Sequence, residues 1–343
     1  MKKKLPKLIA VLGPTASGKT KLAIKLVKKF NGEIVSADSR QIYKGMDIGT
    51  AKPTKKERQG IPHYLLDVAS PKRKFTVAQY RKLAIIAIKK ILKKKKIPFL
   101  VGGTGFYIQA VVDGIVIPEV KPDWKLRKKL EKKSVEELYK ILKRLDSRRA
   151  KTIERKNPRR LIRAIEIVMK TKKPVPPLKF QPLPYPVLMI GIKRNKKELQ
   201  NLIRKRFFKW LKQGLIKEVV NLKKSGLSWK RIEDFGIHYR VIARYLQNKI
   251  GDKEMVENSI REIQNYARRQ LTWFKRDERI YWIKKYSEAE KLVKNFFEIK
   301  KRGLDPSFFS RRRKENLSKA FQNPFGGNVI MQISVSKKKV PSL

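Results

Sequence analysis

Short strand-like runs alternate with helical patterns along most of the chain. Apolar residues recur at helical spacing between these runs, notably over Val77–Leu92 and Lys196–Leu222. The strand-like runs are Leu8–Leu12, Glu33–Ala37, Pro98–Val101, Val187–Ile192 and Ile280–Ile283. Alternation of this kind predicts an α/β fold with a mostly parallel sheet flanked by helices.

The pattern changes between residues 118 and 186. Charged helical segments follow one another without a convincing strand, at Trp124–Lys133, Val135–Leu145 and Arg159–Lys170. A proline-rich stretch from Pro174 to Pro186 closes the segment and cannot lie inside a helix. We therefore predict a core in two parts, residues 1–117 and 187–300, separated by an all-helical insertion at 118–186. The basic segment 301–343 is expected to be a disordered tail.

The most informative motif follows the first strand-like run. Residues 13–20 read Gly-Pro-Thr-Ala-Ser-Gly-Lys-Thr and match G-x-x-x-x-G-K-[ST], and apolar residues at helical spacing come next. Strand, glycine loop and helix form the setting that a phosphate-binding P-loop requires. Backbone N–H groups would cradle a polyphosphate, with Lys19 as a mobile charge and Thr20 as a magnesium ligand. The predicted phosphate site comprises Gly13, Pro14, Thr15, Ala16, Ser17, Gly18, Lys19 and Thr20.

Two further strand ends carry polar residues. Asp38 follows the second strand-like run, and Thr104 follows the third within Gly102-Gly103-Thr104-Gly105. Ligands of open parallel sheets lie beyond the carboxyl ends of the strands, so both side chains should face the phosphate loop. Asp38 could hold magnesium or accept a proton, and Thr104 offers a hydroxyl. For both residues the alternative is a capping role on the following turn or helix.

The residues next to Asp38 extend this candidate site. Ser39 and Gln41 could hydrogen-bond a base edge, and Arg40 a phosphate.

Composition points to a second, polyanionic partner. The 343 residues include 87 Lys+Arg against 29 Asp+Glu, for a formal net charge of +58, whereas 41% of residues are hydrophobic, as in a folded protein. Part of the excess can reflect a lysine-biased composition and solvated faces, but the remainder favours RNA or DNA. The absence of cysteine excludes disulfides and cysteine-ligated zinc. No stretch approaches the ~20 apolar residues of a membrane span, so we expect a cytoplasmic protein, and we also expect a monomer.

Together these motifs closely resemble those of the tRNA dimethylallyltransferases, also called tRNA isopentenyltransferases. The resemblance covers about residues 7 to 285. Besides the three strand ends, it rests on the segments Met46–Pro53, His63–Asp67 and Tyr266–Phe274. It implies transfer of the dimethylallyl group from dimethylallyl diphosphate to N6 of adenosine 37, beside the anticodon of tRNA.

The resemblance also implies roles for individual residues. The P-loop would hold the diphosphate leaving group with Lys19 and Mg²⁺, the metal being bound by Thr20 and Asp38. Asp38 would be the general base, and Thr104 would hydrogen-bond near the reacting atoms. The implied tRNA-binding residues are Asp38, Ser39, Arg40, Gln41, Thr104, Arg127, Arg159, Arg160, Leu161, Ile162 and Arg163. For the arginines, a solvated helix face is the alternative.

The chain departs from the family pattern at three places. Arg159 replaces a common glutamine, and Leu202 replaces the first arginine of an Arg-Ile-x-x-Arg helix in which Arg206 is kept. His238 lies in a segment that differs from the commoner form and is a poor metal ligand without a second one. Trp273, Phe274 and Trp282 could stack on bases, but core packing is favoured.

Two other functions fit parts of the sequence. A P-loop kinase acting on a small molecule or a nucleic-acid end would use the same fold and loop, but it would not need the residues around Asp38 or so basic an insertion. A non-catalytic RNA-binding protein could use the loop to grip phosphate.

Overall fold

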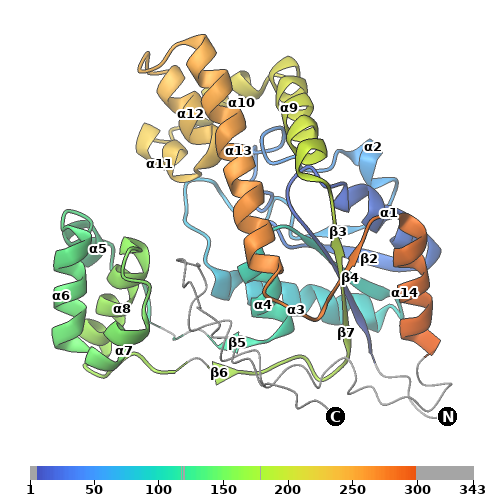
Figure 1. The fold of residues 1–343 in the computed structure, drawn as a ribbon, viewed down its shortest axis with the longest axis horizontal. Helices are drawn as coiled ribbons and strands as arrows, with labels where there is room; N and C mark the ends of the chain where they lie inside the picture. Colours follow the sequence, from blue (N-terminus) through green and yellow to red (C-terminus); the bar gives the residue numbers. More distant parts are fainter. Residues whose placement is uncertain (1–5, 117, 119, 178, 299–343) are drawn as a thin grey trace, which may run out of the picture. The chain divides into compact units, whose positions relative to one another are not determined.

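A parallel sheet forms the centre of the computed structural model, which describes residues 6–116, 118, 120–177 and 179–298. Its six strands have the order β3-β2-β4-β1-β7-β8, and all neighbours are parallel (Figure 1). The strands are β1 (Leu8–Leu12), β2 (Gly32–Ser36), β3 (His63–Tyr64), β4 (Ile97–Gly102), β7 (Val187–Ile192) and β8 (Ile280–Ile283). The predicted α/β fold with a parallel sheet is confirmed.

Helices cover both faces of the sheet. They are α3 (Val77–Lys93) and α4 (Gly105–Val112) on one face, and α1 (Lys19–Lys29) and α14 (Tyr286–Glu298) on the other. Successive residues of a strand point to opposite faces. Leu8, Ala10 and Leu12 of β1 therefore pack with α3 and α4, whereas Ile9 and Val11 pack with α1 and α14. This double covering explains why β1 is apolar throughout.

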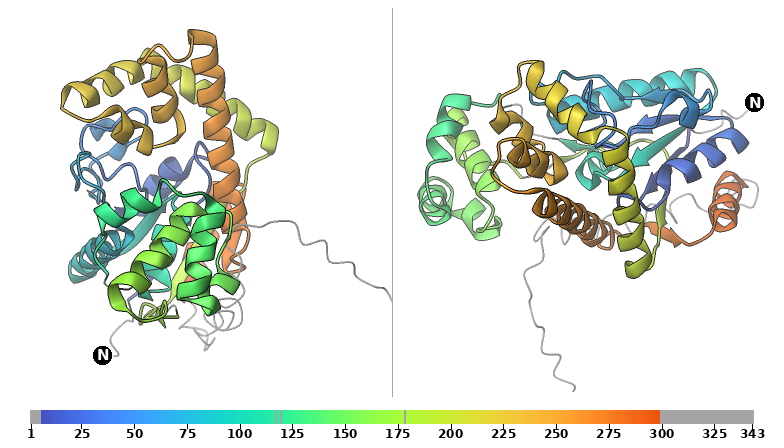
Figure 2. Two further views of the ribbon diagram at one scale, coloured as in Figure 1. Left: turned by 90° about the vertical axis from the view of Figure 1, so that its left-hand side faces the viewer. Right: turned by 90° about the horizontal axis from the view of Figure 1, so that it is seen from above.

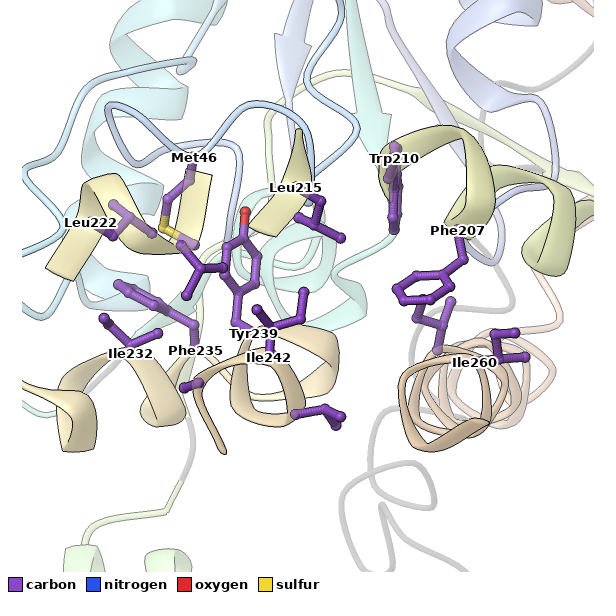
Figure 3. Packing of buried hydrophobic residues seen from close by; sticks show 14 of the residues in the cluster. Met46, Phe207, Trp210, Leu215, Leu222, Ile232, Phe235, Tyr239, Ile242 and Ile260 are labelled. Carbon is purple, nitrogen blue, oxygen red and sulfur yellow. The ribbon is translucent and has the colours of Figure 1, made fainter. Parts of the chain in front are cut away.

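Further helices form a second core with the loop that follows β2. The helices are α9 (Lys196–Lys212), α10 (Leu215–Lys224), α11 (Trp229–Asp234), α12 (Ile237–Tyr245) and α13 (Asp252–Phe274), and the short α2 (Lys55–Arg58) lies in the segment after the loop. Met46 from the loop joins the apolar cluster that includes Leu222 and Tyr239 (Figure 3). The loop is therefore part of a packed core rather than a free connection.

The long helix α13 links this second core to the sheet. The short helices α10, α11 and α12 gather near its N-terminal end, and its C-terminal end reaches α4 (Figures 1 and 2). The helical pattern over Lys196–Leu222 corresponds to two helices, α9 and α10. Gly214, with φ of 94°, lies in the left-handed region and separates α9 from α10.

Residues 120–176 form a compact unit with a core of their own. The unit contains α5 (Trp124–Leu130), α6 (Val135–Leu145), α7 (Ser147–Thr152) and α8 (Pro158–Thr171). Each helix has a side-chain N-cap, from Asp123, Ser134, Asp146 and Asn157. α7 was not anticipated, because six residues are too few to show a helical period.

The predicted insertion is not free of strands. β6 (Lys179–Phe180) pairs with β5 (Ile115–Val116) in an antiparallel two-stranded sheet. Two residues give no alternation to recognise in a sequence. The predicted tail at 301–343 lies outside the described residues, and none of the described helices is long and apolar enough to cross a membrane.

Candidate active site

The glycine loop connects β1 to α1 through an unusual backbone conformation. Gly13 and Gly18 have φ of 148° and 94°, and Ala16 has φ of 63°, so the loop winds through backbone conformations that favour glycine. A Cβ on Gly13 would also lie 3.2 Å from the Ser17 hydroxyl oxygen, a tight contact. Gly18 is the N-cap of α1, where backbone N–H groups and the helix dipole favour negative charge.

The Lys19 side chain contacts the backbone of this loop. Its Nζ donates to the Pro14 carbonyl at 2.7 Å. Burial, together with the Arg206 guanidinium, lowers the pKa of Lys19 to about 7, although the Asp38 carboxylate opposes the shift. The charges of Arg206 and Asp38 are thus both close enough to affect Lys19.

Arg206 of α9 lies near this loop, because its charge acts on Lys19. Burial lowers its pKa, and Glu57 partly offsets the effect. None of the hydrogen bonds or ion pairs among the described residues involves the Arg206 guanidinium, so its N–H groups can bind an anion. The arginine that the chain keeps from the family pattern is therefore close to Lys19 of the phosphate loop.

Asp38 combines the two roles that its sequence position suggests. Its Oδ1 accepts from the N–H groups of Arg40 at 2.8 Å and Gln41 at 3.3 Å, so the carboxylate does cap the turn. Within the described chain, Oδ2 receives no hydrogen bond, and the side chain is half-buried. One carboxylate oxygen is therefore available for chemistry.

Thr104 joins the ends of β2 and β4. Its Oγ1 accepts from the Ser39 N–H at 3.0 Å and lies 3.4 Å from the Ser39 hydroxyl. Thr104 is the N-cap of α4, but its hydroxyl does not cap the helix, so the capping alternative is wrong here. Gly102 permits the contact, since a Cβ there would lie 2.1 Å from the Ala37 carbonyl oxygen.

The side-chain amide of Gln41 forms hydrogen bonds within the protein. Its Nε2 donates to the carbonyls of Thr50 and Ala51 at 3.2 and 3.1 Å, and its Oε1 accepts from Ser36. Both ends of the amide thus have protein partners, and the predicted contact of Gln41 with a base edge stays a prediction. Arg40 instead lies over the Phe235 ring, 5.9 Å from its centroid.

Two side chains of α13 reach the site, and the sequence had not assigned them a role. Gln270 accepts from the Thr15 N–H and donates to the Gly103 carbonyl, both at 2.8 Å. Tyr266, one turn earlier, hydrogen-bonds to Thr104, and burial raises its pKa. The four-residue spacing places both on one helix face, but only the packing of α13 shows what that face touches.

A buried carboxylate organises the loop after β2. Glu218 of α10 accepts from the N–H groups of Asp47, Ile48 and Gly49 at 2.7, 2.7 and 3.1 Å, and from the Tyr239 hydroxyl at 2.7 Å. This contact was missed, because Glu218 is 171 residues from Asp47.

His238 is buried beside other aromatic rings. It is 4% exposed, its ring packs against those of Trp210 and Tyr239, and burial lowers its pKa to about 3. The described part of the chain contains no group of three His, Asp or Glu side chains that could hold a metal. Of the aromatic residues, Phe274 is buried, whereas Trp273 packs edge-on against the partly exposed Phe106.

The arginines of the helical unit 120–176 differ in their hydrogen-bond partners and exposure. Arg127 donates to both oxygens of Glu166 at 2.8 and 2.6 Å, and Arg163 donates to the same carboxylate at 2.5 Å. Glu166 is fully buried. Burial alone would raise its pKa, but hydrogen bonds from Arg127, the Asp123 N–H and Arg163 hold the pKa below its usual range.

The other predicted RNA contacts of this unit differ in exposure. Arg159 is exposed, and Arg160 lies 3.7 Å from Glu154. Leu161 and Ile162 are 0% and 6% exposed and pack in the core of the unit. These apolar side chains hold α8 in place, and a contact of Leu161 and Ile162 with tRNA stays a prediction.

Fold and site together define a class. A parallel sheet with a glycine loop at the end of a central strand is the architecture of P-loop proteins, and here the loop is accompanied by a carboxylate and a hydroxyl from neighbouring strand ends.

Comparison with known proteins identifies the family. The family model described as IPP transferase matches residues 41–277. The tRNA dimethylallyltransferase of Acetivibrio thermocellus is 42% identical over 84% of this chain and 95% of its own length, and that of Halothermothrix orenii is 41% identical over 84% and 93%. The chain therefore belongs to the tRNA dimethylallyltransferase family.

Solved structures agree with this assignment. The crystal structure of the full-length tRNA isopentenylpyrophosphate transferase from Bacillus halodurans has 35% identity and a TM-score of 0.65, and the match covers 86% of this chain and 98% of that one. A eukaryotic dimethylallyltransferase acting on tRNA, at 23% identity and a TM-score of 0.67, shares the fold.

Proposed function

We propose that this chain transfers the dimethylallyl group of dimethylallyl diphosphate to N6 of adenosine 37 in tRNA. The bond between the prenyl carbon and the diphosphate oxygen breaks, a bond from N6 to that carbon forms, and diphosphate leaves with the electron pair. The supporting observation is that the phosphate loop, Asp38 and Thr104 lie together at the carboxyl edge of the sheet. The Asp38 carboxylate is close enough to Lys19 to affect its pKa, and Thr104 accepts the N–H of Ser39, the residue after Asp38.

The leaving group would be stabilised by the loop and two cations. Backbone N–H groups of residues 13–20 hold the diphosphate, and Lys19 and Arg206 offset the charge that develops as the carbon–oxygen bond breaks. Arg206 suits this role because its guanidinium has no protein partner within bonding distance in the described chain. Leu202 replaces the first arginine of the family pattern, so Arg206 is the one arginine of that pattern that this chain keeps.

Magnesium fits the residues present. Mg²⁺ prefers oxygen ligands and commonly combines one or two protein groups with substrate phosphates. Thr20 and Asp38 supply a hydroxyl and a carboxylate oxygen. A bound ion would neutralise diphosphate charge. Because only one oxygen of Asp38 is open, we assign that oxygen chiefly to proton transfer and Thr20 to the metal.

The acceptor would be activated by Asp38. Its open Oδ2 takes the proton from the exocyclic amine as N6 attacks, while the two N–H groups on Oδ1 keep the carboxylate oriented. Thr104, held by Ser39 and Tyr266, would hydrogen-bond near the reacting atoms. The adenosine must leave the anticodon loop to reach this depth.

The RNA would also contact the helical unit 120–176. Arg159 is exposed and free to reach phosphates, whereas Arg127 and Arg163 present guanidinium groups held by Glu166. Monomeric state and cytoplasmic location stay predictions.

The test compares two donors. Purified protein is incubated with tRNA and either labelled dimethylallyl diphosphate or labelled ATP, and the nucleosides are analysed by mass spectrometry. We expect a dimethylallyl group on one adenosine and no phosphate transfer. Activity with ATP alone would instead establish the kinase, and binding of tRNA without any transfer would establish a non-catalytic RNA-binding protein.

A further inference from the structure

The amide of Gln270 closes one end of the phosphate loop. Its Oε1 accepts the Thr15 N–H and its Nε2 donates to the Gly103 carbonyl, both at 2.8 Å. A P-loop binds phosphates through its backbone N–H groups. Here one of those groups, the Thr15 N–H, is already occupied by a side chain from an element 255 residues away.

The occupied end is where a longer polyphosphate would extend. One end of the cradle is the start of α1 at Gly18, where helix N–H groups bind an anion. The loop lysine of this motif reaches the β- and γ-phosphates. Lys19 Nζ lies at the Pro14 carbonyl, 2.7 Å away, so the outer phosphates belong beside Pro14 and Thr15. Gln270 therefore sits where a third phosphate would be bound.

Gln270 has little freedom to move away. It is 6% exposed, and α13 carries it as part of a continuous helix of 23 residues. A Cβ on Gly103 would lie 2.2 Å from Gln270 Nε2 and 3.4 Å from the Gly13 carbonyl oxygen. The ends of β1 and β4 and the amide of Gln270 are thus packed against one another without spare room.

We propose that Gln270 is a specificity-determining residue that limits the loop to diphosphates and excludes triphosphates, nucleoside triphosphates included. This inference rests on the proposed function and deepens it, because it explains how a P-loop selects a diphosphate ester. Charge alone would act in the opposite direction: Lys19 and Arg206 attract a triphosphate more strongly than a diphosphate. A preference for the shorter chain must therefore come from the shape and occupied donors of the cradle.

The test measures binding of inorganic diphosphate and inorganic triphosphate by calorimetry, with Mg²⁺ in excess and no tRNA. We expect the wild-type protein to prefer diphosphate by about tenfold or more, and Gln270→Ala to lower that ratio about five- to tenfold by tightening triphosphate binding. Gln270→Asn, which keeps an amide but shortens it, should act in the same direction. Gln264→Ala, a matched glutamine on the same helix, should keep the wild-type ratio.

Two results would overturn the inference. One is a wild-type protein that binds triphosphate as tightly as diphosphate. The other is an unchanged ratio in a Gln270 variant whose thermal unfolding shows that it is folded. Because neither ligand carries a prenyl group and no RNA is present, the outcome is independent of the donor assay that tests the proposed function.

Discussion

At the scale of single residues, Asp38 separates its structural and chemical roles between its two oxygens. Oδ1 caps the turn through the N–H groups of Arg40 and Gln41, and Oδ2 is open. An asparagine at position 38 keeps an oxygen that can cap the turn, but its amide cannot act as a general base. An alanine removes both.

Asp38→Asn is therefore the sharper variant. We expect single-turnover prenyl transfer to fall by about 100-fold or more, with tRNA binding close to that of the wild type, because only proton acceptance is lost. Asp38→Ala should in addition lower the thermal unfolding midpoint. Near-normal turnover in a folded Asp38→Asn variant would show that the base lies elsewhere.

The pKa of about 7 for Lys19 predicts a pH dependence of diphosphate binding. A bound anion favours the charged ammonium. Below pH 7 the free protein already carries that charge, whereas above pH 7 binding must take up a proton, so affinity falls by up to about tenfold per pH unit. Calorimetry between pH 6 and 9, in buffers of different ionisation enthalpy, measures this uptake.

Two variants test the assignment. Lys19→Met should take up fewer protons than the wild type when it binds diphosphate above pH 7. Protonation of diphosphate itself is the same with either protein, so the difference in uptake measures Lys19. Arg206→Gln should move the onset of uptake to higher pH, because the Arg206 charge lowers the pKa of Lys19. Equal uptake by wild type and Lys19→Met would mean that another group titrates.

At the scale of elements, the loop after β2 connects a distant helix to the catalytic turn. Glu218 of α10 holds the N–H groups of Asp47, Ile48 and Gly49, and the next two carbonyls accept from Gln41. Gln41 in turn donates its backbone N–H to Asp38. The orientation of Asp38 thus depends on a hydrogen-bond chain that begins in α10.

Glu218→Gln should loosen this chain. Loss of charge-assisted hydrogen bonds in a buried site should lower the free energy of unfolding by about 1–3 kcal/mol. Hydrogen exchange at the amides of residues 47–49 should accelerate, and prenyl transfer should slow. Tyr239→Phe removes only one of the four donors and should cost about 1 kcal/mol. Unchanged exchange at residues 47–49 would contradict this role of Glu218.

At the scale of the whole molecule, the net charge of +58 predicts steeply salt-dependent tRNA binding. The arginines of the helical unit 120–176 differ in their surroundings. Arg159 is exposed, whereas Arg127 and Arg163 donate hydrogen bonds to the buried Glu166 carboxylate.

Arg159→Ala should lower the slope of log binding constant against log salt by about one, without changing stability. Arg127→Ala should instead lower the free energy of unfolding by about 1–3 kcal/mol, because Glu166 loses a bidentate partner in a buried site. Filter binding at several salt concentrations and chemical denaturation distinguish the two effects. An unaltered salt slope in Arg159→Ala would place the RNA elsewhere.

The sequence by itself determined the parts that depend on neighbours along the chain. The bounds of β1 and β7 match the predicted runs Leu8–Leu12 and Val187–Ile192, because a buried parallel strand is continuously apolar. The glycine loop follows from the local geometry that its motif requires. Asp38 and Thr104 could be placed at one edge because parallel strands end on the same side of a sheet.

Only the tertiary structure decided which distant groups meet. Gln270 lies 255 residues from Thr15, and Glu218 lies 171 residues from Asp47, so no local pattern relates them. The burial of Leu161 and Ile162 likewise depends on which side of α8 faces its neighbours. Short-range spacing fixes backbone geometry, whereas the partners of a side chain are set by the packing of whole elements, which a linear sequence does not display.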